Sequence, residues 1–223
     1  MKVGEVLRLG RMEYDACRRL QFGLLDEVAD GRRPDTLVMV EHPPVYTLGA
    51  NFHRENLPLS PEEYARRGVD VQPTERGGDV TYHGPGQLVV YPIFDLRRHG
   101  RDIHKWLRDL EETMLLTLAD FGFEARRFPP HTGVWVGDEK VAAIGVKVRR
   151  WTSMHGIALN CDNDLTPFEW IVPCGIRGYG VTSLTRLVGR TVTPNEAASV
   201  TMKSFEKVFE IYLSPMPSPA FGK

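Results

Sequence analysis

The chain has 223 residues, of which 42% are hydrophobic and 26% charged, so it is long enough to bury a sizeable core. Its 28 basic and 29 acidic residues leave a net charge of −1, which argues against nucleic-acid binding, since that function needs a clear basic excess. No apolar run approaches the roughly 20 residues that cross a bilayer. We therefore expect neither nucleic acid nor a membrane as a partner.

Residues 1–16 lack the unbroken apolar core of a signal peptide, and we expect a cytoplasmic protein. The chain has three cysteines, an odd number, and they lack the regular spacing of a disulfide framework, which argues against structural disulfides. Cys17 lies in an apolar stripe and is expected to be a small buried hydrophobe, and Cys161 is also expected to be structural.

The first part of the chain predicts a short strand at 3–9 and a helix at 13–29, whose apolar residues recur at helical spacing. A buried strand at 36–40 follows and ends near His42. Two prolines after His42 hold it in an extended loop, where we expect it to make a local hydrogen bond. The polar segment 50–67 is irregular apart from a short helix.

The remaining elements are predicted in chain order as strands at 69–72 and 88–93, a helix at 102–120, a hairpin of strands 134–136 and 140–148, a strand at 155–161, and a last helix that begins at Pro194. Strands outnumber helices and include hairpins, which predicts an α+β fold with helices packed on a mixed β-sheet. We expect a single domain over residues 1–213 and a loose tail at 214–223.

The stretch RGGDVTYHGPGQ, from Arg76 to Gln87, concentrates glycine beside a buried strand. Glycines leave the backbone open to a ligand, and loops next to buried strands often carry binding sites. Two tight turns joined by a short strand would give the same composition, so this stretch alone leaves both interpretations open.

Cys174 lies between Pro173 and Gly175, in a turn that would leave a nucleophilic thiolate reachable. A free thiol has a pKa of about 8.5 and is mostly protonated at neutral pH. A cation about 4 Å away stabilises the thiolate by on the order of 4 kcal/mol, which is enough to make it the major form. Candidate cations are Lys140, Lys147, His83, His131 and His155. Lys140 lies where the hairpin turn enters a buried strand, so its backbone has little freedom and its side chain could be directed inward. Residue type alone would favour a solvated lysine.

Other chemistries fit less well. His155, Cys161 and Cys174 lack the close pairing of zinc ligands, so we expect no metal. A serine hydrolase would need a G-x-S-x-G elbow, which the sequence does not contain.

Three motifs in this order, RGGDVTYHGPGQLVVYPI, EKVAAIGVKVRRWTSMHGIALN and FEWIVPCGI, closely resemble those of the bacterial lipoyl(octanoyl) transferases. The resemblance spans about Arg76 to Leu184, and EHPPVYTLG at Glu41 to Gly49 also fits. It implies the fold of the biotin and lipoate ligase catalytic domains.

The resemblance also implies an activity, the transfer of an octanoyl group from acyl carrier protein to a lysine of lipoyl domains. The acceptors would be E2 subunits of 2-oxoacid dehydrogenases and the glycine cleavage H protein. No cofactor is implied, and we expect a monomer. Catalytic roles fall on Cys174, as the acyl-thioester carrier, and on Lys140, its partner.

Substrate contacts are implied for three segments. They are Arg76, Gly77, Gly78, Asp79, Val80, Thr81, Tyr82 and His83; Ala143, Ile144 and Gly145; and Gly156, Ile157 and Ala158. Tyr82, His83, Ile144 and Ile157 are the expected apolar walls for the octanoyl tail.

Three alternatives remain open. An ATP-dependent lipoate or biotin ligase of the same fold would activate the free acid and need no cysteine. A non-catalytic module that binds lipoyl domains or the carrier protein would give no reason for Cys174 and Lys140. A thioesterase would release free octanoate to water.

Overall fold

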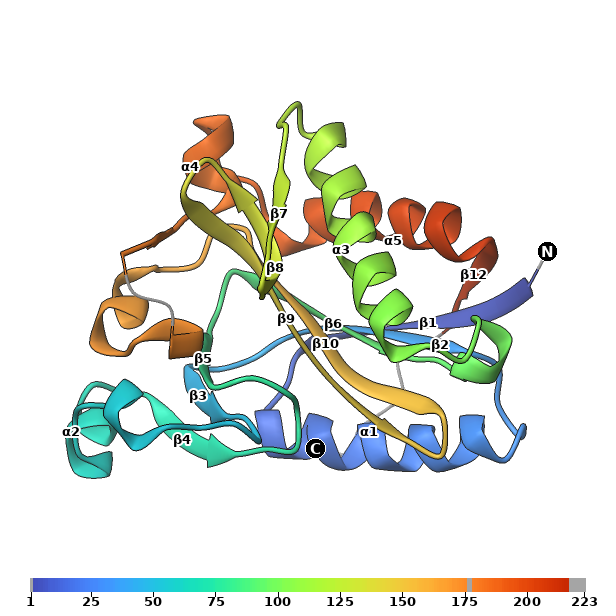
Figure 1. The fold of residues 1–223 in the computed structure, drawn as a ribbon, viewed down its shortest axis with the longest axis horizontal. Coiled ribbons are helices and arrows are strands. Elements are labelled where there is room, and N and C mark those ends of the chain that lie inside the picture. Colours follow the sequence, from blue (N-terminus) through green and yellow to red (C-terminus); the bar gives the residue numbers. More distant parts are fainter. Residues whose placement is uncertain (1, 176–177, 217–223) are drawn as a thin grey trace.

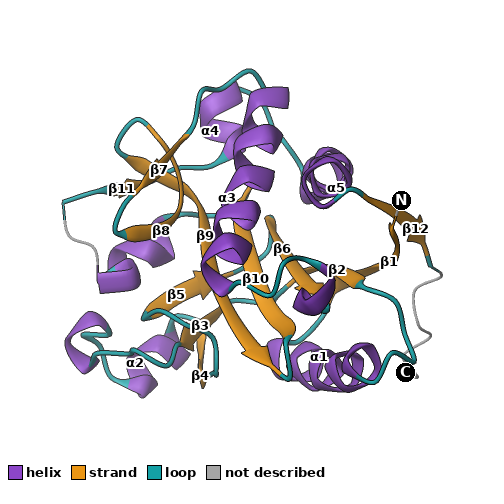
Figure 2. Cartoon of the chain, turned by 45° about the vertical axis from the view of Figure 1, so that its right-hand side comes forward, coloured by secondary structure: helices purple, strands orange, loops and turns teal. Residues whose placement is uncertain are grey.

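The computed structural model describes residues 2–175 and 178–216, with the backbone alone at Cys174. A large sheet forms the middle layer of the molecule (Figure 1). Helix α1 (Tyr14–Ala29) covers one face, and helices α3 (Ile103–Asp120) and α5 (Pro194–Phe209) cover the other. Figure 2, turned by 45°, shows the same separation.

The large sheet runs in the spatial order β12 (Ile211–Pro215), β1 (Lys2–Arg11), β2 (Thr36–Glu41), β6 (Gln87–Ile93), β10 (Thr152–Asn160), β9 (Glu139–Arg149), β8 (His131–Val136) and β7 (Arg126–Phe128), with β11 (Gly180–Val181) beside β9. Strands β12, β1 and β2 are parallel neighbours, and the path from β2 to β7 is antiparallel. The mixed sheet and the helices on it confirm the predicted α+β class.

A second sheet and several short helices build the region around the candidate site. The sheet has the order β4 (Asp70–Pro73), β3 (Val45–Leu48) and β5 (Val80–His83). The short helices are α2 (Pro61–Arg66), α4 (Leu184–Val188), η1 (Arg54–Asn56), η2 (Leu96–Arg98), η3 (Thr166–Trp170) and η4 (Pro173–Gly175).

The core follows from the alternation of side chains along central strands. In β2, Leu37 and Met39 pack towards α3 and α5, whereas Val38 and Val40 pack towards α1. Successive residues of a strand point to opposite faces, so a continuous apolar run is needed where both faces are covered. At about 25 cal/mol per Å² of apolar surface, burial on both faces provides the main stabilisation of these strands.

Capping residues lie at the starts of three helices. The Asp102 carboxylate accepts hydrogen bonds from the backbone at the start of α3, and Thr193 caps α5 with proline at its first position. Ser60 and Glu63 form the reciprocal capping box of α2. These predicted helix starts are confirmed.

Several short elements were not predicted. Strand β3 has four residues and directly follows two prolines, and its partners β4 and β5 lie well downstream in the chain. At the other end, Ser214 and Pro215 pair with Glu5 and Val6, so β12 extends into the segment expected to be a loose tail. The last residues of that segment, 217–223, lie outside the described residues.

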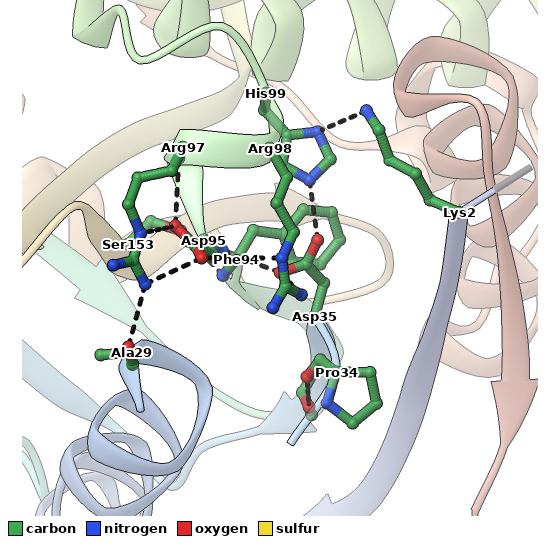
Figure 3. A network of polar contacts seen from close by, with 11 residues as sticks. Lys2, Ala29, Pro34, Asp35, Phe94, Asp95, Arg97, Arg98, His99 and Ser153 are labelled. Atoms are coloured by element: carbon green, nitrogen blue, oxygen red, sulfur yellow. Dashed lines mark hydrogen bonds and ion pairs between the residues drawn. The ribbon is translucent and has the colours of Figure 1, made fainter. Parts of the chain in front are cut away.

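A polar network ties the end of α1 to the entrance of β2 and to η2 (Figure 3). His99 Nε2 donates to Asp35 at 2.8 Å, and Asp35 also accepts from the backbone N–H of Asp95. Arg97 bridges Asp95 and the carbonyl of Ala29. Two nearly buried carboxylates are therefore fully hydrogen-bonded, as buried charges must be.

None of the helices in the described ranges is both long enough and apolar enough to span a bilayer.

Candidate functional site

The glycine-rich stretch is held by close contacts between backbones. Gly77 N–H donates to the carbonyl of Val146 on β9, and Asn51 N–H donates to the carbonyl of Gly78. A Cβ on Gly145 would lie 2.8 Å from the Gly77 oxygen, and one on Gly49 would lie 2.2 Å from the Gly78 oxygen. These distances exclude any side chain, so glycine allows the loop to lie directly against both neighbours.

Arg76 anchors this loop from inside the protein. Its Nε and one terminal nitrogen donate to the hydroxyl of Thr47 on β3 at 3.1 and 3.0 Å, and the same nitrogen donates to the Thr47 carbonyl. The other terminal nitrogen donates to the Gly77 carbonyl at 3.0 Å. The guanidinium is nearly buried, and charge-assisted hydrogen bonds compensate for its loss of hydration.

Strand β5 divides the expected substrate contacts between two faces. Thr81 and His83 line a cavity between the glycine-rich loop and strands β9 and β10. Val80 and Tyr82 point the other way, into a separate apolar cluster, as the two-residue period of a strand requires. Tyr82 therefore packs against Tyr46 and Phe168 instead of lining this cavity.

We call this first space the histidine cavity, with a volume of about 40 Å³. The following residues with expected substrate contacts line it: Arg76, Gly77, Gly78, Thr81, His83, Ala143, Ile144, Gly145, Gly156, Ile157 and Ala158. Tyr14, Val89, Tyr91 and His155 complete the lining. Three segments that are distant in sequence thus meet around one cavity.

Three histidines in and behind this cavity are neutral at pH 7. Burial lowers the pKa of His83 to about 3, and the nearby His42 lowers it further. The pKa of His155 is also lowered to about 3, mainly by burial and then by the charge of Arg76. Burial lowers the pKa of His42 to about 4. His42 hydrogen-bonds the carbonyl of Met12 and the hydroxyl of Tyr91, a structural role as expected, although its partners are distant in sequence.

Lys140 lies in an adjoining space of about 30 Å³, the lysine cavity. Its side chain is nearly buried, and Nζ lies 4.6 Å from the ring centroid of Trp135 on the neighbouring strand β8. A cation over an indole ring is stabilised electrostatically, so Trp135 helps to hold the ammonium group in the cavity. Thr81, Ala143 and Ala158 line both cavities and so connect them.

The turn that carries Cys174 is the short helix η4, and its side chain lies outside the described residues. Pro173, directly before it, and Tyr179, after it, line the lysine cavity. The structure therefore brings the proline–cysteine–glycine turn to the cavity that contains Lys140, while the contact between the two side chains stays a prediction.

Asp79 directly precedes β5 and lies beside the same turn. Its carboxylate accepts hydrogen bonds from His53 Nδ1 at 2.9 Å, from the Asn56 amide at 2.7 Å and from two backbone N–H groups. Burial alone would raise the pKa of this carboxyl, but the hydrogen bonds from His53 and Asn56 outweigh it and keep the pKa below its usual range.

Two amides in the lysine cavity were missed by the sequence reasoning. Gln87 donates to the Asn160 side chain at 2.9 Å and accepts from His83 Nδ1 at 2.8 Å. Asn160 in turn donates to the carbonyl of Thr182. Both amides lie in or beside the recognised motifs. Their position at the ends of buried strands is the sequence signal that would have indicated a role in the site.

Cys17 and Cys161 are both fully buried, and burial raises the pKa of each thiol to about 12. The structural role predicted for both is confirmed. Within residues 2–175 and 178–216, no group of His, Cys, Asp and Glu side chains is arranged to hold a metal ion.

Comparisons with known proteins agree with this geometry. Residues 14–206 match the family model described as the lipoyl protein ligase A/B catalytic domain. An octanoyltransferase of Geobacter metallireducens is 51% identical over 184 residues, covering 82% of this chain and 83% of the relative. An octanoyltransferase of Solibacter usitatus is 45% identical, covering 96% of each chain.

Among solved structures, a putative lipoate protein ligase from T. acidophilum superimposes with a TM-score of 0.74 at 18% identity. The match covers 97% of this chain and 88% of that one. At this identity the likeness concerns the fold alone, and it confirms the expected ligase-like architecture.

Proposed function

Since this chain belongs to the lipoyl protein ligase A/B catalytic domain family and is an acyltransferase, we propose that it transfers an octanoyl group from acyl carrier protein to a lysine of lipoyl domains. Cys174 carries the acyl group as a thioester, and Lys140 assists it. The acceptors are E2 subunits of 2-oxoacid dehydrogenases and the glycine cleavage H protein, and the enzyme acts as a cytoplasmic monomer.

One observation carries this proposal: Lys140 and Pro173, which precedes Cys174, line the same cavity. A nearly buried lysine beside a cysteine turn has an electrostatic purpose, because its charge favours the thiolate over the thiol. The connected histidine cavity offers Ile144 and Ile157 to an acyl tail.

The reaction then has two steps. The Cys174 thiolate attacks the carbonyl carbon of the carrier thioester, a new C–S bond forms, and the carrier leaves as a thiolate. Exchange of one thioester for another is nearly thermoneutral, so the first step requires no nucleotide. In the second step the acceptor lysine attacks the acyl-cysteine, the C–N bond forms, and Cys174 leaves. Formation of the more stable amide drives this step.

The direct test is the intact mass of the protein after incubation with octanoyl carrier protein. We expect one octanoyl adduct on the wild type, none on Cys174→Ser, and loss of the adduct when a lipoyl domain is added. Cys161→Ala is the matched control, because its thiol is buried and outside both cavities. No adduct on the wild type, with acylation only when ATP and free acid are supplied, would establish a ligase instead.

A further inference from the structure

The segment of Cys174 rests on a hydrogen-bonded group that comes from η1 and β5. Val172 N–H donates to the Asn56 carbonyl at 2.9 Å. A Cβ on Gly175 would lie 3.2 Å from the Asn56 amide nitrogen and 3.6 Å from Asp79 Oδ2. In Figure 1 the orange segment that includes η4 lies beside β5. The Asp79 carboxylate is therefore in the immediate surroundings of the cysteine turn.

His53 completes this group from the solvent side. Its Nδ1 donates to Asp79 Oδ2 and its backbone N–H donates to Oδ1, so the carboxylate orients the ring through two contacts. A carboxylate can only accept, which places the ring proton of neutral His53 on Nδ1 and leaves the lone pair on Nε2. The side chain is 63% exposed, so a lysine presented by another protein can reach it.

The charges around the ring strengthen it as a base. Asp79, directly before β5, and, to a smaller extent, Glu55 on η1 are the charged groups that act on it, and both are acidic. The hydrogen bond to Asp79 comes first among the causes that raise the pKa of His53 above its usual 6.5. A raised pKa makes the neutral imidazole a stronger acceptor for the amine proton.

We propose that His53, oriented by Asp79, is the base that takes a proton from the acceptor lysine during transfer from acyl-Cys174. This inference rests on the proposed function and adds a residue to it. It also separates two tasks. Lys140, held inside its cavity by Trp135, serves the thiolate, whereas His53 serves the incoming amine from outside.

The proton balance is as follows. The acceptor lysine arrives as an ammonium and loses one proton to solvent to become a nucleophile. Its nitrogen attacks the thioester carbonyl, the C–N bond forms, and the second proton moves to His53 Nε2. The C–S bond then breaks and its electron pair leaves with the Cys174 sulfur as a thiolate. The imidazolium returns its proton to solvent, which restores the enzyme.

The test measures the two half-reactions separately by intact mass. In His53→Ala, we expect octanoyl carrier protein to load Cys174 at nearly the wild-type rate. Transfer from the isolated acyl-enzyme to a lipoyl domain should fall about 100-fold, since general-base catalysis contributes 10²–10⁴. The pH profile of transfer should also lose the inflection that the imidazole causes and keep only the rise that comes from deprotonation of the acceptor lysine. Added imidazole should restore part of the rate.

Two further variants make the result decisive. His104→Ala removes an exposed histidine at the start of α3 and should leave both half-reactions unchanged. Asp79→Asn keeps the size of the side chain but removes the charge, and it should slow transfer and lower the pH midpoint of the transfer rate. If His53→Ala transfers octanoate at the same rate and with the same pH profile as His104→Ala, His53 is not the base. Failure of the wild type to form the adduct at all would instead refute the proposed function.

Discussion

The anchor of the glycine-rich loop can be weakened without changing the shape of the side chain. Thr47→Val replaces the hydroxyl that accepts from Arg76 by a methyl group and leaves the Thr47 carbonyl in place. The guanidinium is nearly buried and loses two of its contacts. Hydrogen bonds to charged groups contribute about 1.5–3 kcal/mol each, and two bonds to one oxygen are not additive. We expect a loss of about 3 kcal/mol in the free energy of unfolding.

For a chain of this length, each kcal/mol lowers Tm by about 2–4 °C, so the expected drop is about 6–12 °C. Thr117→Val is the matched control. It is equally buried, but its hydroxyl bonds only the neutral groups of Thr113 and Ser204, which predicts a loss of about 1 kcal/mol. Urea unfolding of both variants measures the difference. Equal losses in the two variants would refute the view that the buried charge of Arg76 depends on Thr47.

Three further predictions concern the charges and the turn of the site. The buried histidines stay neutral in the fold but bind protons when unfolded, so the free energy of unfolding should fall as pH drops from 6.5 towards 3. His42→Gln should make this slope shallower by about 1.4 kcal/mol per pH unit in urea titrations. An unchanged slope would contradict the conclusion that His42 is neutral in the folded protein. Lys140→Met should slow adduct formation about 100-fold or more, whereas the exposed Lys147→Met on the same strand should not; equal rates would exclude an electrostatic role. Gly175→Ala should impair acyl transfer more than Gly189→Ala does, because both have positive φ but only Gly175 faces close neighbours; assays showing equal activity would contradict a tightly held turn.

The sequence predicts the long elements because their physics is local. Helix α3 has both a capping residue and an apolar face, and β6 is a continuous apolar run, so each is visible within its own residues. Strand β3 is stabilised mainly by partners far along the chain, and no local pattern reveals it.

In the candidate site, too, some features follow from the local sequence and others depend on partners distant in the chain. The motifs identify Lys140 and the cavity-lining glycines, and the two-residue period explains why Thr81 faces the cavity while Tyr82 does not. The contact of His53 with Asp79 joins residues 26 positions apart through a loop. No spacing rule links such positions, so only the folded chain brings that pair to the cysteine turn.

The parallel pairing of β1 with β12 has a consequence for biosynthesis. Lys2 pairs with Ile211 and Val6 with Pro215, so the first strand of the described chain waits for its last strand to be made. Until then β1 presents an unpaired backbone edge, which can recruit strands of other nascent chains. Closing this pair also joins the most distant points of the described chain, the slowest kind of contact to form. This side of the sheet is therefore completed only after the rest of the described sheet has been synthesised, and the chain is most vulnerable to aggregation until then.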